Sequence, residues 1–428
     1  MTVRGLRWWV VLLVGLGTVL NYLSRSTLSV AAPALMRSLA MTTHEYSYVV
    51  AAFQAAYAVA QPFAGYILDV IGLRIGFAVF AAAWSAANLS VSFTGGWTGL
   101  AAARGLLGLA ESAGIPAAMK TVTRWFPAEE RSIATGWFNA GASVGSMLAP
   151  PLVVYCIVRY DWRAAFLVTG ALGVFWAILW FIAYRPPESH PLLSAGERRH
   201  ILGQPLSGQP VSGRSGAAAA GDTKPSWREI IGNRRFAGIA AARFLSEPAW
   251  QTINYWIPIY LVTVRHMDLK DIAGFAWIPF LAADVGSIAG GYLPPFFGRQ
   301  FNMTVVASLK LVVAIGCLGM VGPAAIGTVA SAYGAIGLFC LGAFAHQTLS
   351  GALYALTANV FAPREIASAV GLTGSAGYLG GLLFSLAIGA VASQIGFGPV
   401  FFSMWMLDLT AAGLVWIAVR PTRQAPGG

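Results

Sequence analysis

Charged residues are scarce in this 428-residue chain: they make up 10% of it, whereas soluble proteins carry about 25%. Hydrophobic residues make up 57%, and the mean hydropathy is +0.67. A chain with so little charge cannot cover a water-facing surface, which excludes a soluble protein. Its apolar stretches are continuous and do not alternate, so the sequence predicts an all-α integral membrane protein.

Cysteine and the common catalytic motifs are also scarce or missing. Cys156, Cys317 and Cys340 are far apart in apolar surroundings, so no disulfide framework or metal site is readable and no cofactor is expected. The chain has no P-loop, His-Glu-x-x-His motif or dinucleotide fingerprint, which leaves ATP-driven transport and enzymatic activity without support. Residues 141–145 match G-x-S-x-G, but within a long apolar stretch the Gly-x-x-x-Gly spacing favours close helix packing over a hydrolase elbow.

Twelve stretches are apolar enough for a membrane-spanning helix of about 20 residues. They lie at 8–35, 46–68, 75–94, 97–119, 132–157, 164–184, 236–263, 272–296, 303–323, 327–359, 366–393 and 396–419. A segment rich in Gly, Ser and Pro separates the first six from the last six. We therefore expect an N-terminal six-helix bundle at 1–185, a cytoplasmic linker at 186–235 and a C-terminal six-helix bundle at 236–428.

Basic residues gather on one side of these spans. The opposite set of loops carries only Arg37, Arg159, Arg163, Arg265 and Lys270. The positive-inside rule then places both termini in the cytoplasm, as an even number of spans requires. The net charge of +11 is explained without nucleic acid. The expected partner is the lipid bilayer, and the expected state is a monomer.

The two halves repeat each other weakly. The repeat predicts a pseudo-twofold axis along the membrane normal, with a site between the halves near the midplane. The matches are Asn21-Tyr22 with Asn254-Tyr255, at an offset of 233, and Phe126, Gly136 and Gly145 with Phe361, Gly371 and Gly380, at an offset of 235.

Arg25 is the first informative charge inside a span. Tyr22 and Asn21 precede it by three and four positions, so the three share one helix face. Arginine keeps its charge and offers a planar fork to a carboxylate, which favours capture of an anionic substrate. Two alternatives are an arginine that snorkels to the outer end of the span and a structural partner of Glu111.

Arg104 and Glu111 lie two turns apart in the fourth span and face one way. Charge inside a membrane is costly and usually functional. Burial favours the protonated form of Glu111, whereas a nearby arginine favours the ionised form. This competition suits a proton carrier, and the alternative is a fixed ion pair.

Other polar residues in the spans could meet the hydroxyl groups of a sugar, or could form hydrogen bonds between helices. The candidates are Tyr57, Asn139, Asn254, Tyr255, His346 and Gln347. A buried histidine can also be an ordinary core residue. Arg243, four residues before Glu247, could pair with it, and we interpret that pair as structural.

The loop between the second and third spans reads Gly65-x-x-x-Asp69-x-x-Gly72-x-Arg74. Its glycines permit a tight turn, and Asp69 lies at a helix end where it can pair with basic residues of the other bundle. We expect Asp69 and Arg74 to act in gating.

This loop, with twelve spans in two halves, resembles the major facilitator superfamily. Longer stretches over nearly the whole chain resemble the bacterial hexuronate transporters of the anion:cation symporter family. They include NYLSRSTLSVAAPAL, ARGLLGLAESAGIPAAMK, RFLSEPAWQTINYWIPIYL and AFAHQTLSGAL. The resemblance implies the major facilitator fold and proton-driven uptake of glucuronate or galacturonate across the inner membrane.

The resemblance also implies roles for single residues. Arg25 matches an arginine that meets the substrate carboxylate, and Tyr22 and Tyr57 match tyrosines that line the site. Glu111 matches a protonatable carboxylate, with Arg104 as its partner.

Two positions depart from the wider family. Ser24 stands where many members have an aspartate that takes part in proton coupling, and a hydroxyl residue there is typical of the hexuronate-like branch. Val70 stands where a basic residue is usual.

The hypothesis from the sequence is a proton-coupled importer of hexuronates that works by alternating access. The alternative within transport is a symporter for another organic anion, such as an aldonate, an aldarate or an aromatic carboxylate. A sensor that does not transport, a channel and an intramembrane hydrolase are alternatives from other classes.

Overall fold

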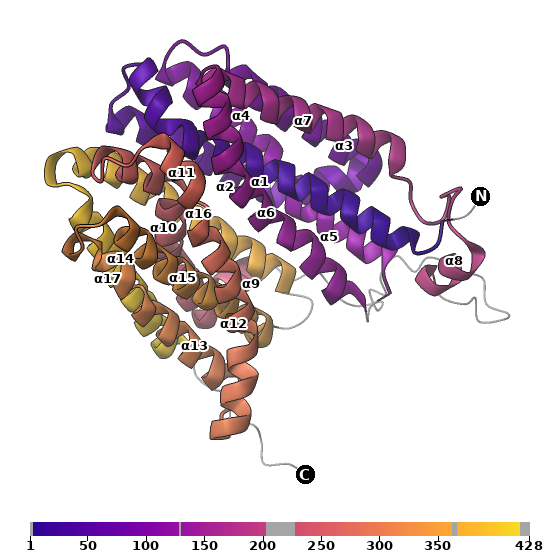
Figure 1. The fold of residues 1–428 in the computed structure, drawn as a ribbon. Coiled ribbons are helices and arrows are strands. Elements are labelled where there is room, and N and C mark those ends of the chain that lie inside the picture. The colour runs from indigo at the N-terminus through magenta and orange to yellow at the C-terminus, as the bar shows by residue number, and fades with distance from the viewer. Residues whose placement is uncertain (1–2, 128–129, 203–226, 362–365, 420–428) are drawn as a thin grey trace.

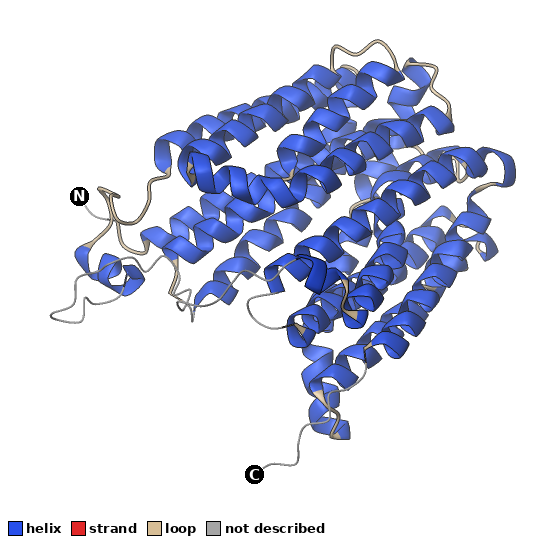
Figure 2. Ribbon diagram, turned by 180° about the vertical axis from the view of Figure 1, so that it is seen from behind, coloured by secondary structure: helices blue, strands red, loops and turns tan. Residues whose placement is uncertain are grey.

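The computed structural model describes residues 3–127, 130–202, 227–361 and 366–419. Long helices dominate these residues (Figures 1 and 2). The first half contains α1 (Leu6–Ser38), α2 (Thr43–Ile71), α3 (Leu73–Val91), α4 (Trp97–Glu111), α5 (Gly114–Trp125), α6 (Arg131–Arg159) and α7 (Trp162–Ala183). The second half contains α10 (Arg234–Thr263), α11 (Leu269–Phe275), α12 (Ile278–Phe301), α13 (Val305–Gly319), α14 (Val321–Ala324), α15 (Ala332–Val360), α16 (Ile366–Ile395) and α17 (Phe397–Ala418), with a 3-10 turn at Ile326–Thr328.

Nine helical segments within the described residues are long and apolar enough to cross a membrane. In lipid the backbone must satisfy its own hydrogen bonds, which is why apolar runs of this length are helical. The chain is therefore an all-α, multi-pass membrane protein, as its composition predicts. The number twelve itself stays a prediction.

Three of the expected spans are broken in two, which the apolar pattern did not predict. The range 97–119 becomes α4 and α5, 272–296 becomes α11 and α12, and 303–323 becomes α13 and α14. Pro116 lies three residues after the first break and has no N–H to donate to the carbonyl of Ser112. The break between α4 and α5 follows Glu111 directly.

The same packing pattern occurs in both halves. In the first half, α1 packs on α6, α2 on α4 and α3 on α7; in the second, α10 packs on α16, α12 on α15 and α13 on α17. Each pair in one half corresponds to a pair in the other. The structure thus has the two pseudosymmetric bundles of the major facilitator fold.

Gly145 and Gly380, matched by the repeat, occupy equivalent places. A Cβ on Gly145 would overlap the carbonyl oxygen of Val19 on α1, and one on Gly380 would overlap that of Phe244 on α10. Both positions need glycine because the backbone of the neighbouring helix passes so close.

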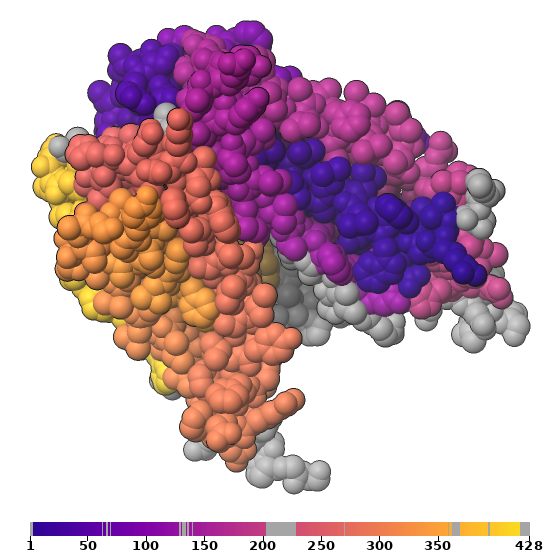
Figure 3. Space-filling model, viewed as in Figure 1, coloured from indigo at the N-terminus to yellow at the C-terminus, as the bar shows by residue number. Residues whose placement is uncertain are grey.

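The two halves meet toward one side of the molecule. There α2 packs on α16, and the Tyr46 hydroxyl donates to the Tyr255 carbonyl oxygen at 3.1 Å. On the side where the chain ends lie, the halves diverge, and Figure 3 shows a hollow between them.

Part of the predicted linker is described as α8 (Ala195–Leu202) and α9 (Trp227–Ile231), while 203–226 lies outside the described residues. Glu197 of α8 accepts hydrogen bonds from the backbone N–H groups of Leu6 and Arg7, both at 3.1 Å. These donors have no partner within α1, so α8 caps the start of that helix. The division into domains at 185 and 235 stays a prediction.

Candidate functional site

An ion pair between α1 and α4 forms the centre of the site. The guanidinium of Arg25 donates from Nε to Glu111 Oε2 at 3.1 Å, and Nη2 lies 3.0 Å from the same oxygen. Glu111 is buried, and its other oxygen, Oε1, has no hydrogen-bond partner among the described residues. Within the chain as described, the pair therefore balances its charge but leaves one carboxylate oxygen unpaired.

Aromatic rings surround the Arg25 guanidinium. Its central carbon lies 4.8 Å from the ring centroid of Tyr22, 5.1 Å from that of Phe53 and 5.0 Å from that of Tyr57. Such rings stabilise a cation that has lost its water. The sequence brings Tyr22 to this place by its three-residue spacing from Arg25 on α1.

The second half completes the site through Tyr378 of α16. Arg25 Nη1 donates to the Tyr378 hydroxyl at 3.2 Å, and the Tyr378 ring stacks on Tyr57 at 4.5 Å between centroids. The cation of one half thus has a partner in the other, so movement of the halves apart at this level changes its coordination.

A small cavity adjoins the carboxylate of Glu111. Its volume is about 10 Å³, close to what one water molecule needs. Asn21 and Trp84 contribute to its walls, which place the cavity largely within the first half. In this arrangement the cavity is too small for a sugar acid.

Arg104 lies on the same side as Glu111 but is not paired with it. It is fully buried, and it interacts electrostatically with the hydroxyl groups of Tyr46 and Tyr255. The Phe53 ring lies near both arginines, 4.8 Å from the Arg104 guanidinium and 5.1 Å from that of Arg25. Glu111 therefore has Arg25 as its direct partner, and Arg104 acts on it through its field.

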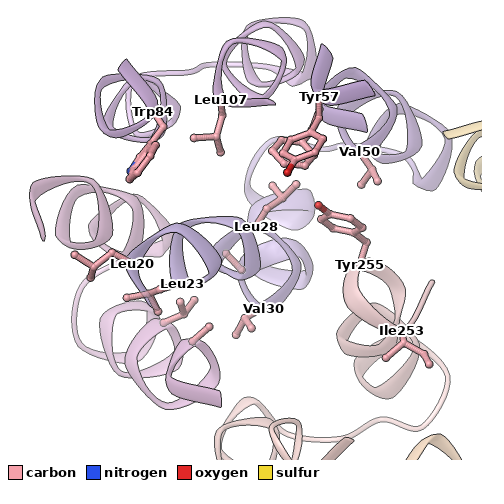
Figure 4. Packing of buried hydrophobic residues seen from close by; sticks show 14 of the residues in the cluster. Leu20, Leu23, Leu28, Val30, Val50, Tyr57, Trp84, Leu107, Ile253 and Tyr255 are labelled. Atoms are coloured by element: carbon pink, nitrogen blue, oxygen red, sulfur yellow. The ribbon is translucent and has the colours of Figure 1, made fainter. Parts of the chain in front are cut away.

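Tyr57 and Tyr255 come from opposite halves and approach each other. In Figure 4 the Tyr255 hydroxyl points from α10 toward Tyr57 on α2, with Leu28 beside them. Both tyrosines are buried. The structure thus brings Tyr22, Arg25, Tyr57, Glu111 and Tyr255 into one region.

The other predicted polar residues of the second half lie outside this cluster. Asn254 donates to the Trp250 carbonyl oxygen at 2.7 Å and lines a separate small cavity with Ser26 and Ser146. His346 is buried and stacks in parallel on Trp250 at 5.8 Å. Gln347 is half-buried on α15.

The predicted gating residues are only partly described. The side chains of Asp69 and Asn139 lie outside what the structure describes. Arg74 donates from Nε to the Phe181 carbonyl oxygen at 2.9 Å, within its own half. Gly72 has φ of 86°, a left-handed value that explains a glycine at this turn. A gating role for Asp69 and Arg74 stays a prediction.

Ser143, the serine of the apparent hydrolase motif, lies within α6 and hydrogen-bonds Asp284 of α12. Gly141 packs against α1, where its Cβ would lie 2.6 Å from the Gly15 carbonyl oxygen. The motif is therefore a helix-packing motif with a contact between the halves, as its apolar context predicts.

Sequence reasoning missed Tyr378 and Phe53. Tyr378 stands alone among small residues in GSAGYLGG, and a single large polar side chain in such a stretch is the available signal. Phe53 has no local signal, because one phenylalanine among many apolar residues in a span is ordinary.

Comparisons with known proteins agree with this architecture. The family model described as Major Facilitator Superfamily matches residues 14–385. The chain is 48% identical to the hexuronate transporter of Escherichia coli strain K12, over 98% of this chain and 95% of that protein. It is 47% identical to the galacturonate transporter of Dickeya chrysanthemi, over 78% of this chain and 94% of that one. A D-xylose-proton symporter has a similar structure, with a TM-score of 0.75, 15% identity and coverage of 96% and 97%, which shows the fold alone.

Proposed function

The chain belongs to the major facilitator superfamily and is a transporter, not an enzyme, and from that premise we propose that it imports hexuronates together with protons across the bacterial inner membrane. The substrates proposed are glucuronate and galacturonate. The observation that carries this proposal is the buried Arg25–Glu111 pair, held within tyrosine rings from both halves. Near full-length similarity to transporters named for these acids supports the choice of substrate.

The substrate carboxylate competes with Glu111 for Arg25. Both are carboxylates, and Arg25 already donates from Nε to one oxygen of Glu111, with Nη2 3.0 Å from the same oxygen. When the substrate takes that place, Glu111 loses its counter-charge inside the protein, and a buried carboxylate without a partner binds a proton. Substrate binding and protonation thereby favour each other.

The sugar hydroxyls are proposed to contact hydroxyl and amide groups that line the site around Arg25. Tyr22, Tyr57, Tyr255 and Tyr378 adjoin the guanidinium, while Asn139, Asn254, His346 and Gln347 are further candidates. The field of Arg104 adds attraction for the anion.

Both termini are proposed to lie in the cytoplasm, because the loops on their side carry most of the basic residues. The hollow in Figure 3 then opens to the cytoplasm. The sugar acid and the proton leave to the cytoplasm from this arrangement. Rocking of the two halves then opens the site to the outside of the cell.

The driving force depends on the number of protons. One proton with one monoanion carries no net charge, so it gains only about 1.4 kcal/mol per unit of pH difference. A second proton would add about 2.3 kcal/mol per 100 mV of membrane potential. We propose at least one proton, carried by Glu111.

The test is uptake of radiolabelled galacturonate and glucuronate by proteoliposomes with internal pH recorded at the same time. Acidification of the lumen in step with sugar uptake is expected. Aldonates, aldarates and aromatic carboxylates serve as competitors, and faster uptake of one of them would contradict the hexuronate assignment. Exchange of labelled for unlabelled substrate without a gradient distinguishes a carrier from a channel or a sensor.

A further inference from the structure

A buried arginine of the other half has the same kinds of partners as Arg25. Arg243 on α10 donates from Nη2 to Glu247 Oε2 and to the Tyr354 hydroxyl, both at 2.9 Å. Its guanidinium lies 4.5 Å from the Tyr354 ring centroid. Arg25 likewise has a glutamate, a tyrosine hydroxyl and tyrosine rings around it. Each half thus carries one such set, on its first helix.

The Arg243 set can be reached from the hollow between the halves. Tyr354 is 41% exposed, and its hydroxyl interacts electrostatically with Tyr22 of the opposite half. The Tyr354 hydroxyl therefore lies on the side of α15 that faces the first half. Behind it, Arg243 is buried, and its Nε has no hydrogen-bond partner among the described residues.

The two sets adjoin each other at α16. Glu247 packs against Gly377, where an added Cβ would lie 3.3 Å from the Glu247 Cβ. The next residue, Tyr378, accepts the hydrogen bond from Arg25. The Tyr378 hydroxyl also interacts electrostatically with both Arg25 and Arg243. A carboxylate that leaves Arg25 has a second cation next to it.

Arg243 lies nearer than Arg25 to the open end of the hollow. The helix α10 begins on the side of the chain ends, and Asn254 on it shares a cavity with Ser26, the neighbour of Arg25. Arg243 comes eleven residues before Asn254 (254 − 243), about three helical turns toward the chain-end side.

We propose that Arg243 and Tyr354 form a second, inner binding position for the carboxylate of a sugar acid, which the ligand occupies after Arg25 on its way out. This inference rests on the proposed function of Arg25. Glu247 holds Arg243 while the position is empty, and Gln251 Nε2 donates to Glu247 Oε1 at 3.1 Å. The ligand's carboxylate takes the place of Glu247 on the guanidinium, as it does that of Glu111 on Arg25.

The test is binding of D-galacturonate to the purified full-length chain in lipid nanodiscs, by isothermal titration calorimetry. Arg25→Gln is expected to weaken binding roughly 100-fold and to leave a residual, weaker phase. Adding Arg243→Gln with Glu247→Gln, which removes both charges together, is expected to weaken that residual phase at least about tenfold. D-galactose, which has no carboxylate, should show no binding to the inner position.

The outcomes separate the two claims. Unchanged binding in Arg25→Gln would contradict the proposed role of Arg25. Two other outcomes would overturn the inner position alone. In the first, Arg25→Gln loses tight binding and leaves no residual phase. In the second, a residual phase remains but is unaffected by adding Arg243→Gln with Glu247→Gln. Tyr354→Phe keeps the ion pair and should weaken the residual phase several-fold, which tests the proposal even where the double variant does not fold. The exposed pair Arg163–Asp161, changed to Gln and Asn, is the matched control and should alter neither phase.

Discussion

Arg25 directs two nitrogens at a single oxygen of Glu111, at 3.1 and 3.0 Å, while the other carboxylate oxygen has no partner among the described residues. An arginine fork fits both oxygens of a carboxylate better than one. The pair is therefore geometrically incomplete, and under the proposed function a ligand carboxylate that accepts bidentately would displace Glu111.

Removal of the Arg25 cation should weaken anion binding strongly. In Arg25→Ala, the substrate carboxylate loses its charged donor, and Glu111 loses its partner. We expect affinity for galacturonate to fall roughly 100-fold, about 3 kcal/mol, measured as the concentration that half-saturates counterflow. Arg163→Ala, at an exposed position, is the control. Unchanged affinity in Arg25→Ala would refute the carboxylate assignment.

Removal of the titratable group should separate transport from accumulation. Glu111→Gln keeps the size of the side chain but cannot exchange a proton. We expect proton-driven accumulation in proteoliposomes to stop, while counterflow of galacturonate continues. Loss of both activities in a variant that folds normally would instead indicate a structural role for Glu111.

Much of the fold could be predicted because the membrane constrains it so strongly. Apolar runs located the long helices, and matched glycines such as Gly145 and Gly380 located equivalent helix contacts. The helix break after Glu111 was not predicted, because an apolar run looks the same whether or not a proline such as Pro116 interrupts its hydrogen bonds.

The charged residues of the site could be predicted from the sequence, because charge inside a membrane is costly and therefore rare. Arg25 and Glu111 are conspicuous in apolar spans for this reason. Their direct pairing was harder to predict, because Arg104 shares a helix face with Glu111 while Arg25 comes from another helix. Tyr378 was missed, since its contact with Arg25 depends on how two distant halves pack.

The Tyr378 hydroxyl links the Arg25 cation to the second half. Tyr378→Phe keeps the ring that stacks on Tyr57 but removes the acceptor for Arg25 Nη1. A hydrogen bond to a charged group contributes about 1.5–3 kcal/mol, so we expect substrate affinity to change by about tenfold or more. The affinity is measured as the concentration of unlabelled substrate that half-inhibits counterflow of the labelled substrate. Tyr333→Phe, at an exposed position, should have no effect.

Close helix contact at Gly380 should make this position intolerant of any side chain. Gly380→Ala places a methyl group against the Phe244 carbonyl oxygen, so α10 and α16 must move apart. We expect a loss of roughly 1–3 kcal/mol of stability, seen as a lower apparent melting temperature of the purified protein. Gly371→Ala in the same helix meets nothing within 4 Å and is the matched control. Equal melting temperatures for the two variants would contradict the packing argument.

Acid should release α8 from the first bundle through Glu130. Arg7 Nε donates to Glu130 Oε2 at 3.0 Å, and His200 Nε2 lies 3.0 Å from Glu130 Oε1. Burial alone would raise the pKa of Glu130, but the hydrogen bond with His200 and the charge of Arg7 outweigh it and hold the pKa below its ordinary value.

Because the folded pKa of Glu130 lies below the unfolded value of about 4.3, this contact stabilises the docked helix above that pH. The stabilisation is lost as the pH falls through the folded pKa. Hydrogen exchange of α8 amides, corrected for intrinsic rates, should therefore accelerate between pH 7 and pH values below about 4. Glu130→Gln should already exchange faster at pH 7, whereas Glu45→Gln, at the exposed cap of α2, should leave α8 unchanged. Protection of α8 that is the same at both pH values would show that Glu130 does not hold this helix, and that the cap which Glu197 makes on α1 is sufficient.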